Sequence, residues 1–410
     1  MPVPPIKTQC CIAGGGPAGM MLGFLLARAG VDVHVLEKHG DFLRDFRGDT
    51  IHPSTLELMH ELGLLEAFLR LPYEKITRLA AQIGPDRVTI ADFGHVPTRC
   101  KFIALMPQWD FLDFLADQGR RYNAFHLHMN TEAIRLIGQD GEIRGVRARA
   151  PDGEIEIAAD LVVGADGRHS TLRREAGMTV DDLGAPMDVL WFRLSRQDTD
   201  DEETFGHVEA GRLFVMLNRG TYWQCAYVIP KGGFEAVKQC GLQALRSDIS
   251  FMSPFVENRI GEIADWDDVK LLTVAVDRLP VWCKERLLFI GDAAHAMSPI
   301  GGVGINLAIQ DAVAAANILF EPLSARSLTL KHLQAVQERR QWPTVVTQRI
   351  QIAVQNRIIG PLLQSRERPR APWPVKLFNV FPVLRRIPAH IVGVGVRPEH
   401  IHAPERFPVT

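Results

Sequence analysis

The sequence lacks the cysteine pattern of a disulfide-rich or zinc-binding protein. Its six cysteines contain no CxxC pair, and no histidine or cysteine cluster along the chain has zinc-ligand spacing. Cys10 and Cys11 lie in a short apolar run, where packing inside a buried strand is the expected role. The spacing therefore predicts no metal site.

Excess charge of one sign is also absent. The 410 residues include 46 Lys and Arg against 48 Asp and Glu, a formal net charge of −2. Such a balance gives no long-range attraction to nucleic acid or to an anionic membrane. The first residues lack the apolar run of a secretory signal, and no stretch reaches the ~18 uncharged apolar residues of a spanning helix. We expect a cytoplasmic globular protein with no nucleic-acid partner and no stable membrane insertion.

The beginning of the chain has the pattern of a βαβ unit, which predicts a parallel sheet. In order, the sequence indicates a strand over residues 10–13, a turn over 14–19, a helix over 20–29 closed by Gly30, a strand over 31–36, a helix from Pro53 to Gly63, and a helix with Asp110 as its N-cap.

Short alternating strands dominate the middle of the chain. Residues 125–163 read as a meander with turns at 138–141 and 151–153, and residues 185–277 are rich in strand patterns around a helical stretch at 234–245. A strand over 287–290 and a long helix from about Gly304 follow. Because a strand followed by a glycine-rich turn and a helix occurs both before and after this β-rich insert, we expect two interwoven domains.

The turn over residues 14–19 is a GxGxxG motif between a strand and a helix. Gly14 lets the chain turn sharply, Gly16 lets backbone approach a pyrophosphate, and Gly19 lets helix and strand pack. The phosphates of a dinucleotide would then lie at the positive end of the helix. Glu37 lies 37 − 14 = 23 residues on, at a strand end, where a carboxylate accepts hydrogen bonds from ribose hydroxyls. The motif predicts a dinucleotide without separating FAD from NAD.

Two later motifs decide the cofactor. One is the turn Gly164-Ala165-Asp166-Gly167, and the other runs from Gly291-Asp292 through Pro299 to Gly301-Gly302-Val303-Gly304-Ile305-Asn306. At these residues the sequence resembles the FAD-dependent aromatic hydroxylases, the group A monooxygenases typified by para-hydroxybenzoate hydroxylase. The likeness extends over roughly residues 8 to 345.

The resemblance implies an α/β fold in which a Rossmann-like FAD-binding domain, of the para-hydroxybenzoate hydroxylase and glutathione reductase type, is interwoven with a β-rich substrate domain. The FAD-binding domain would comprise residues 1–75, 100–182 and 278–345. The substrate domain would comprise residues 76–99 and 183–277, with a mixed sheet. Residues 346–410 would form a C-terminal helical region and tail.

The resemblance and the motifs together nominate the residues that contact FAD. Asp292 would hold the ribityl chain, and the helix after Gly304 would direct its first N–H groups at the flavin, where preorganised donors can be worth ~3–4 kcal/mol each. Arg47 and Gln108 match family positions near the pyrophosphate, and Thr131 to Ala133 match backbone near the adenine. The full set is Gly14, Gly15, Gly16, Pro17, Ala18, Gly19, Glu37, Lys38, Arg47, Gln108, Thr131, Ala133, Asp166, Gly291, Asp292, Pro299, Gly302, Gly304, Ile305 and Asn306.

The implied reaction is a monooxygenation. NADH or NADPH would reduce the FAD, O2 would form a flavin C4a-hydroperoxide, and this would hydroxylate a small aromatic substrate. No second strand–GxGxxG–helix unit is seen in the sequence, so the nicotinamide nucleotide is expected to bind transiently. No catalytic base can be assigned, and His295 and His52 are interpreted as packing and orienting residues.

The substrate would lie over the flavin against the sheet of residues 185–277. Candidate wall residues, of which about half are expected to fill the domain core instead, are Met187, Trp191, Met216, Tyr222, Trp223 and Tyr227.

Several alternatives remain open from the sequence. A Baeyer–Villiger or epoxidising enzyme, a flavin-dependent reductase and an inert flavin-fold binding protein would carry the same motifs. A halogenase is disfavoured because Cys225–Pro230 lacks the tryptophans of WxWxIP. The apolar stretch 373–396, broken by prolines and by Arg385-Arg386, is expected to fold onto the flavin domain or a partner subunit. The protein would be a monomer or a homodimer.

Overall fold

The largest sheet has a parallel core that begins with the first strand of the chain. The computed structural model describes residues 5–43, 50–139, 142–200 and 205–406, and in this part the sheet has eight strands. Its main path, in spatial order, is β19 (Cys283–Lys284), β20 (Leu287–Phe289), β11 (Gly153–Gly164), β1 (Ile6–Ala13), β2 (Val33–Leu36) and β8 (Phe125–His128). Neighbouring pairs from β20 to β8 are parallel, as the βαβ pattern predicts.

The expected meander is present and extends this sheet. β9 (Glu132–Gln139) and β10 (Glu142–Ala150) pair antiparallel with each other, and β10 pairs with β11. Gly153 adopts a φ of +125° at the turn that joins β10 to β11, a conformation that glycine tolerates. The meander therefore returns the chain to the centre of the parallel sheet, and β11 carries it to the second motif.

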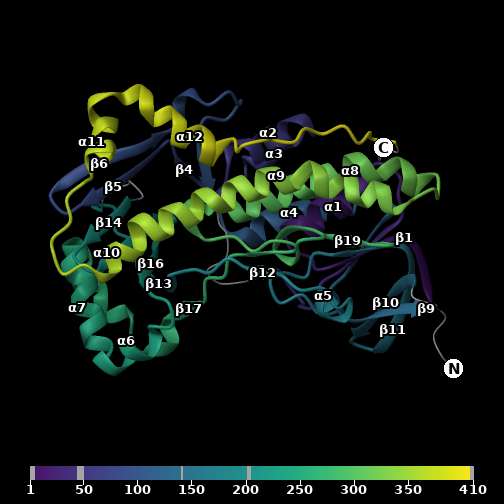
Figure 1. Ribbon diagram of the computed structural model, residues 1–410, viewed down its shortest axis with the longest axis horizontal. Coiled ribbons are helices and arrows are strands. Elements are labelled where there is room, and N and C mark those ends of the chain that lie inside the picture. The colour runs from purple at the N-terminus through teal and green to yellow at the C-terminus, as the bar shows by residue number, and fades with distance from the viewer. Residues whose placement is uncertain (1–4, 44–49, 140–141, 201–204, 407–410) are drawn as a thin grey trace.

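Helices pack along the parallel strands. α1 begins at Pro17, a residue suited to a first turn, and Gly30 closes it with a φ of +83°. α1 contacts both α4 and α8, and α8 runs beside α9 along the length of the molecule (Figure 1). The helices of this part are α1 (Pro17–Arg28), α2 (Pro53–Glu61), α3 (Leu65–Phe68), α4 (Gln108–Gly119), α5 (Thr171–Glu175), α8 (Val303–Ser324) and α9 (Leu330–Val354).

The N-cap predicted for α4 was wrong. Pro107, with an extended ψ of 137°, precedes the first helical residue, Gln108, so Asp110 lies in the first turn instead. A carboxylate there still interacts favourably with the helix dipole, which is why the same residue suggested a helix start.

A second sheet, of seven strands in the described residues, carries the β-rich insert. Its order is β17 (Lys270–Leu272), β13 (Met187–Ser195), β16 (Tyr222–Pro230), β15 (Arg212–Asn218), β14 (Phe205–Glu209), β5 (Arg78–Ile83) and β6 (Asp86–Asp92). α6 (Phe234–Cys240) and α7 (Leu242–Met252) follow β16, separated at Gly241, whose φ is +88°. α7 packs its apolar residues on one face of this sheet.

Short sheets join the two large ones. β7 (Ile103–Leu105) pairs with β3 (Thr50–Ile51) and β4 (Glu74–Ile76), and β12 (Asp181–Asp182) pairs with β18 (Asp277–Arg278). The strands of the large sheets thus fall in the separate ranges predicted for the two domains. The predicted boundary at residue 345 lies inside α9, which continues to Val354 and then into a π-helical turn, Gln355–Ile359, and α10 (Gly360–Gln364).

The C-terminal segment contacts both the seven-stranded sheet and the flavin domain. α11 (Trp373–Val380) and α12 (Arg386–Gly393) pack on β6, the edge strand of the seven-stranded sheet. α12 also contacts the flavin domain, where the Val392 carbonyl lies 2.7 Å from His52 Nδ1 and a Cβ on Gly393 would lie 3.2 Å from Pro53. Ala389 and Val394 complete an apolar cluster with residues of that edge. The chain then crosses back, and Arg406 donates its backbone N–H to Arg28 at the end of α1. The tail therefore ties the two sheets together (Figure 1).

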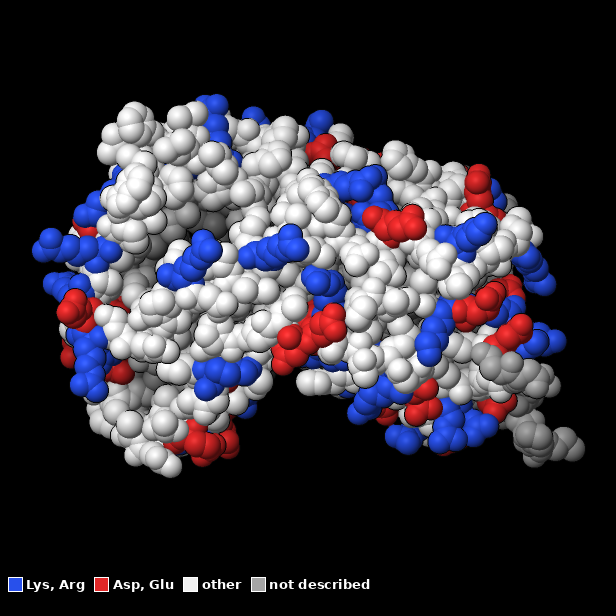
Figure 2. All heavy atoms as spheres, viewed as in Figure 1, with Lys and Arg blue, Asp and Glu red and all other residues white. Residues whose placement is uncertain are grey.

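Exposed side chains fall into two kinds. Large apolar residues remain exposed on the C-terminal helices, among them Trp373 at 76% and Val380 at 66%. On the face shown in Figure 2, basic and acidic side chains are interspersed, as the near-balanced charge predicts. Among the described residues, one helical stretch, Ile300–Ser324, is long and apolar enough to cross a membrane, but 72% of its most apolar window is buried inside the protein, as in a core helix.

Candidate functional site

The three sequence motifs meet at one edge of the parallel sheet. β20, β11 and β1 are neighbours, and each ends where a motif begins. The register pairs Ala13 with Gly164 and Gly164 with Phe289, so the three turns leave the sheet side by side. The carboxyl ends of parallel strands are where ligands of open α/β sheets bind. Segments that lie up to 291 − 14 = 277 residues apart therefore form one site.

The first turn shows where its glycines are required. Gly14 has a φ of +106°, and a Cβ there would lie 2.3 Å from the carbonyl oxygen of Ala165 in the second motif. A Cβ on Gly19 would lie 2.0 Å from the carbonyl oxygen of Gly14. At Gly16, by contrast, no atom lies within 4 Å of the added Cβ. The loop is thus closely packed on the protein side and open where a pyrophosphate would approach.

The N-terminus of α1 supplies donors to that open side. Gly16 is its N-cap and provides no side-chain acceptor, Pro17 has no N–H, and the first turn holds no acidic residue. The N–H groups of Ala18 and Gly19 consequently have no acceptor within the helix. Two aligned donors at the positive end of a helix form an anion site.

Glu37 lies beside this loop, as predicted. Its Oε2 accepts the N–H of Gly15 at 3.0 Å, and its Oε1 accepts the N–H of His39 at 3.1 Å. The backbone of Thr131 donates to the Glu37 carbonyl at 2.7 Å, which brings the predicted adenine segment to the same corner. Thr131 and Ala133 are buried, whereas Lys38 is exposed.

Asp166 holds the second motif in shape. Its Oδ2 accepts the N–H groups of Thr171 at 2.8 Å and Leu172 at 3.2 Å, at the start of α5. Its Oδ1 is buried and has no hydrogen-bond partner in the structure. A buried carboxylate oxygen without a donor is unusual, so Asp166 both orders the turn and retains an acceptor for a ligand.

The third motif packs directly against the first. Gly291 has a φ of +59°, and a Cβ there would lie 3.1 Å from the Cβ of Ala18 and 3.3 Å from that of Ala308. The following residue, Asp292, is about one-third exposed and lies 3.6 Å from the guanidinium of Arg168. The carboxylate of Asp292 therefore faces solvent between the second and third motifs.

The start of α8 is built by a left-handed glycine. Gly302, at φ +62°, is the N-cap, and a Cβ there would lie 2.3 Å from the Oγ1 of Thr50. Thr50 donates its hydroxyl to the Gly302 carbonyl at 2.9 Å. The N–H groups of Val303, Gly304 and Ile305 in this first turn have no acceptor within the helix. These are the donors predicted to face a flavin.

Asn306 has a side-chain role that the sequence did not predict. Its Nδ2 donates to the Thr50 carbonyl at 2.9 Å, and its Oδ1 accepts the N–H of His52 at 2.9 Å and the hydroxyl of Thr55 at 2.8 Å. The side chain thus fastens α8 to β3 and α2. Only its backbone is left for a contact with a cofactor.

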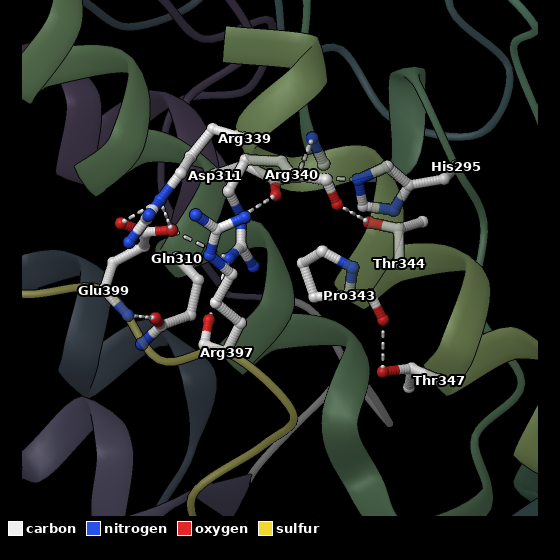
Figure 3. Close-up of polar contacts among 11 residues, drawn as sticks. His295, Gln310, Asp311, Arg339, Arg340, Pro343, Thr344, Thr347, Arg397 and Glu399 are labelled. Atoms are coloured by element: carbon white, nitrogen blue, oxygen red, sulfur yellow. Dashed lines mark hydrogen bonds and ion pairs between the residues drawn. The ribbon is translucent and has the colours of Figure 1, made fainter.

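A buried ionic network supports the third motif from beneath (Figure 3). Asp311 of α8 is fully buried and accepts from Gly291 N at 3.2 Å, His295 Nε2 at 2.6 Å and Arg340 Nε at 3.0 Å. Arg340 also donates to Glu399 of the C-terminal tail at 3.1 Å. Burial alone would raise the pKa of Asp311, but His295 and Arg340 hold this pKa below its usual range.

The two histidines noted in the sequence are both buried. His295 is 1% exposed and its ring bonds Asp311 rather than pointing to an open site. His52 is also 1% exposed; its ring Nδ1 lies 2.7 Å from the Val392 carbonyl, and burial lowers its pKa to about 4. These positions agree with the interpretation of both residues as packing and orienting groups.

The six candidate wall residues divide between the two faces of the seven-stranded sheet. Met216, Trp223 and Tyr227 lie in the core under α7, and Trp223 and Tyr227 bond Asp200 and Asp248 there. Met187 and Trp191 lie on the opposite face, in a cluster that also contains Ile300 of the third motif. Tyr222 shares that face with Ala226, by strand alternation. The wall prediction therefore narrows to Met187, Trp191 and Tyr222.

Two predicted contacts stay predictions. Arg47 lies outside the described residues. Gln108 is the first residue of α4.

Sequence reasoning missed three supporting residues. Thr50 begins the short strand β3 and Arg168 follows the second motif, and only the fold brings them to Gly302 and Asp292. Asp311 did leave a signal, because it is a lone charge in the apolar helix pattern of residues 303–320. A charge at such a position is rarely buried without a partner.

The residues present fit an FAD molecule. The open side of Gly16 leaves room for a pyrophosphate. The N–H groups in the first turns of α1 and α8 can donate to pyrophosphate and flavin oxygens, and Oδ1 of Asp166 can accept from a ligand hydroxyl.

Comparison with known proteins points the same way. A family model described as an FAD binding domain matches residues 7–350. A 6-methylpretetramide 4-monooxygenase of Streptomyces rimosus is 31% identical over 384 residues, which cover 93% of this chain and 92% of that protein. A rifampicin monooxygenase of Streptomyces venezuelae is 27% identical; the match covers 73% of this chain and 61% of that longer protein. The crystal structure of PqsL, a probable FAD-dependent monooxygenase from Pseudomonas aeruginosa, superposes with a TM-score of 0.74 at 22% identity, covering 87% of this chain and 97% of that one.

Proposed function

The chain belongs to the FAD binding domain family of flavoprotein hydroxylases, and we propose that it seats its flavin in the three turns over residues 14–19, 164–167 and 291–306. It is an FAD-dependent monooxygenase of aromatic compounds with the para-hydroxybenzoate hydroxylase-like fold. The observation that carries the placement is the close packing of Gly14 on Ala165 and of Gly291 on Ala18, because together these contacts join all three turns into one cradle.

The protein's own contribution is to bind and orient. When bound, FAD supplies the redox chemistry, taking hydride from NADH or NADPH and allowing one oxygen atom of O2 to reach the substrate. The start of α1 would hold the pyrophosphate, and Glu37 would accept a ribose hydroxyl. Asp292 would accept from the ribityl chain, with Arg168 beside it limiting its freedom. The first turn of α8 would direct N–H groups at the flavin ring, where negative charge collects.

The substrate would lie on the Trp191 face of the seven-stranded sheet. Met187, Val189, Ala226 and Val228 make this face apolar, and Ile300 connects it to the turn that would hold the flavin. Apolar walls exclude water from the place where oxygen is transferred. An aromatic ring is the substrate class that such a wall favours, as the name of the pretetramide relative also suggests.

The test is substrate-dependent oxidation of NADH and NADPH by the purified protein, with the products identified by mass after reaction under isotopically labelled O2. We expect a phenolic compound to accelerate oxidation and to gain one labelled oxygen atom. Flavin reduction with a hydrogenated product, or with no labelled product from any aromatic compound, would instead favour the reductase alternative. A lactone or an epoxide would identify the Baeyer–Villiger or epoxidising alternative.

We further infer that the enzyme acts in the cytoplasm as a monomer or homodimer. The near-zero net charge and the burial of the apolar stretch Ile300–Ser324 support this. Cell fractionation and sedimentation of the native protein test it; recovery in the membrane fraction after a salt wash would contradict it.

A further inference from the structure

Four metal-ligating side chains gather on one face of the parallel sheet, away from the substrate wall. Asp32 directly precedes β2 and His34 is its second residue, whereas His126 and His128 alternate on the neighbouring strand β8. The register pairs His34 with His126 and Leu36 with His128. Because alternate residues of a strand share a face, all four side chains project to the same side.

The other face of these strands is used for packing. A Cβ added to Gly23 of α1 would lie 2.6 Å from Val35 and 3.1 Å from the ring of Phe125, so the residues between the histidines face the helix. The histidines are therefore not needed to complete that core.

The four side chains are already in contact. His126 Nε2 lies 3.1 Å from Asp32 Oδ1, and His34 Nδ1 lies 2.8 Å from His128 Nε2. The ring centroids of His34 and His126 are 4.4 Å apart. One ligand atom from each of Asp32, His34 and His126 lies within 4.8 Å of the other two.

The backbone under the cluster is fixed. Asp32 donates its N–H to Gln9 Oε1 at 2.8 Å, and its carbonyl accepts from Cys10 N at 3.1 Å and Thr8 Oγ1 at 2.8 Å. The side chains differ in their exposure to solvent: His34 is 8% exposed, whereas the side chains of Asp32 and His126 are 39% and 41% exposed. An ion could reach the cluster from solvent and meet a preorganised inner ligand.

We propose that Asp32, His34 and His126 bind a borderline divalent transition-metal ion such as Zn²⁺. Two imidazoles and a carboxylate are ligands that Zn²⁺ takes, and a solvent molecule would complete a tetrahedral shell. The His34–His128 hydrogen bond uses Nδ1 of His34, so Nε2 is the nitrogen left for the metal, and His128 holds the ring as an outer partner. The exposed side chains of Asp32 and His126 rotate inward to reach the ligand distances of about 2.0–2.2 Å.

The site joins two strands whose ends approach the predicted adenine corner. Glu37 follows β2 and donates its N–H to the His128 carbonyl at 2.8 Å. A metal ion bridging β2 and β8 would fix these strand ends relative to each other, and it would raise the thermal stability of the protein through binding to the folded state alone.

The experiment uses tag-free holoprotein, freed of adventitious metal with a chelator and titrated with Zn²⁺ by equilibrium dialysis. Co²⁺ is the spectroscopic probe, because tetrahedral Co²⁺ absorbs at longer wavelengths than oxidised flavin. The variants are His126→Ala and Asp32→Asn, which change half-exposed side chains, with His60→Ala, an exposed histidine at the end of α2, as the matched control.

We expect one Zn²⁺ per chain, a tetrahedral Co²⁺ spectrum and an increase in melting temperature with Zn²⁺. Affinity should fall at least about tenfold in both cluster variants and stay unchanged in the control. Absence of saturable Zn²⁺ binding to the unmodified protein would overturn the proposal. Equal affinity in His126→Ala, Asp32→Asn and His60→Ala would overturn it too, since the ion would then lie elsewhere.

Discussion

Replacement of Asp311 by Asn should weaken the fold and the flavin site together. Asp311 accepts from three donors at once: the Gly291 N–H, the His295 ring and the Arg340 guanidinium. Asparagine keeps the shape of the side chain but has one acceptor oxygen, and its NH2 group would face one of these donors. The change therefore removes a buried negative charge and places donor against donor without opening a cavity.

The expected loss of stability depends on the partners that Arg340 retains when the Asp311 carboxylate is removed. Removing one partner of a buried ion pair costs about 3–5 kcal/mol, because the remaining charge stays buried. Arg340 is 1% exposed but retains Glu399 at 3.1 Å. We therefore expect the lower end, about 3 kcal/mol, which is a large share of the roughly 5–15 kcal/mol that stabilises a typical protein.

The assay is urea denaturation of the holoprotein, followed in parallel by circular dichroism and by the fluorescence of released flavin. Both midpoints should fall in Asp311→Asn, since Gly291 belongs to the motif that we propose contacts the cofactor. The control is Asp117→Asn on α4, where the side chain is 70% exposed; its free energy of unfolding should stay within about 0.5 kcal/mol of the unmodified protein. If the free energy of unfolding of Asp311→Asn lies within about 1 kcal/mol of that of this control, the network does not stabilise the protein as proposed.

Three further predictions concern the glycine turn, acid stability and the substrate wall. Gly14→Ala should abolish retention of FAD, measured as flavin absorbance per chain, because its Cβ would lie 2.3 Å from a backbone oxygen. The control is Gly63→Ala, which also has a positive φ but no atom within 4 Å of the added Cβ, and this variant should keep its flavin. Full flavin retention by Gly14→Ala would contradict the proposed turn. Burial favours neutral Asp200, yet its hydrogen bonds with Arg259 and Trp223 hold its pKa at about 2, and the pKa of Asp311 is also lowered. Both groups therefore stabilise the fold above the unfolded pKa of about 3.9; the contribution of Asp200 is lost as the pH falls toward about 2, and that of Asp311 is lost as the pH falls through its lowered pKa. Asp200→Asn should flatten the pH dependence of unfolding between about pH 4 and 2, and an unchanged slope would refute the assignment. Trp191→Ala should raise the KM for the aromatic substrate by roughly tenfold or more, because the substrate loses contact area with the indole ring. The control is Tyr227→Phe on the opposite face of the sheet, which should leave the KM unchanged. An equal change of KM in both variants would mean that the substrate binds elsewhere.

The glycine turns could be predicted from sequence because each constrains its own backbone. Gly14 and Gly302 have positive φ values and a neighbouring atom at 2.3 Å where a Cβ would stand, so no other residue fits either position without a shift. Such local requirements are readable without knowing the fold. The parallel order of β1 and β11 then follows from the chain leaving both strands at the same edge.

The supporting contacts could not be predicted in the same way. Thr50 reaches Gly302 across 252 residues, and Asp32 meets His126 across 94, so neither pair has a spacing that sequence inspection can recognise. The metal-site proposal shows the consequence: D-x-H and H-x-H segments have no zinc-site spacing until two strands pair in register.

The division of the aromatic candidates has a different physical cause. β16 carries Tyr222, Trp223 and Tyr227, and seven of its nine residues, from Trp223 to Ile229, are buried without alternation. A strand covered on one face shows polar and apolar residues in turn, whereas a strand covered on both faces is apolar throughout. Here α7 covers one face, while residues of the third motif and of the region after α9 cover the other. Strand alternation still separates Tyr222 from Trp223 and Tyr227, but only the packing of α7 places Trp223 and Tyr227 in a core, and a sequence gives no sign of the face on which a helix will pack.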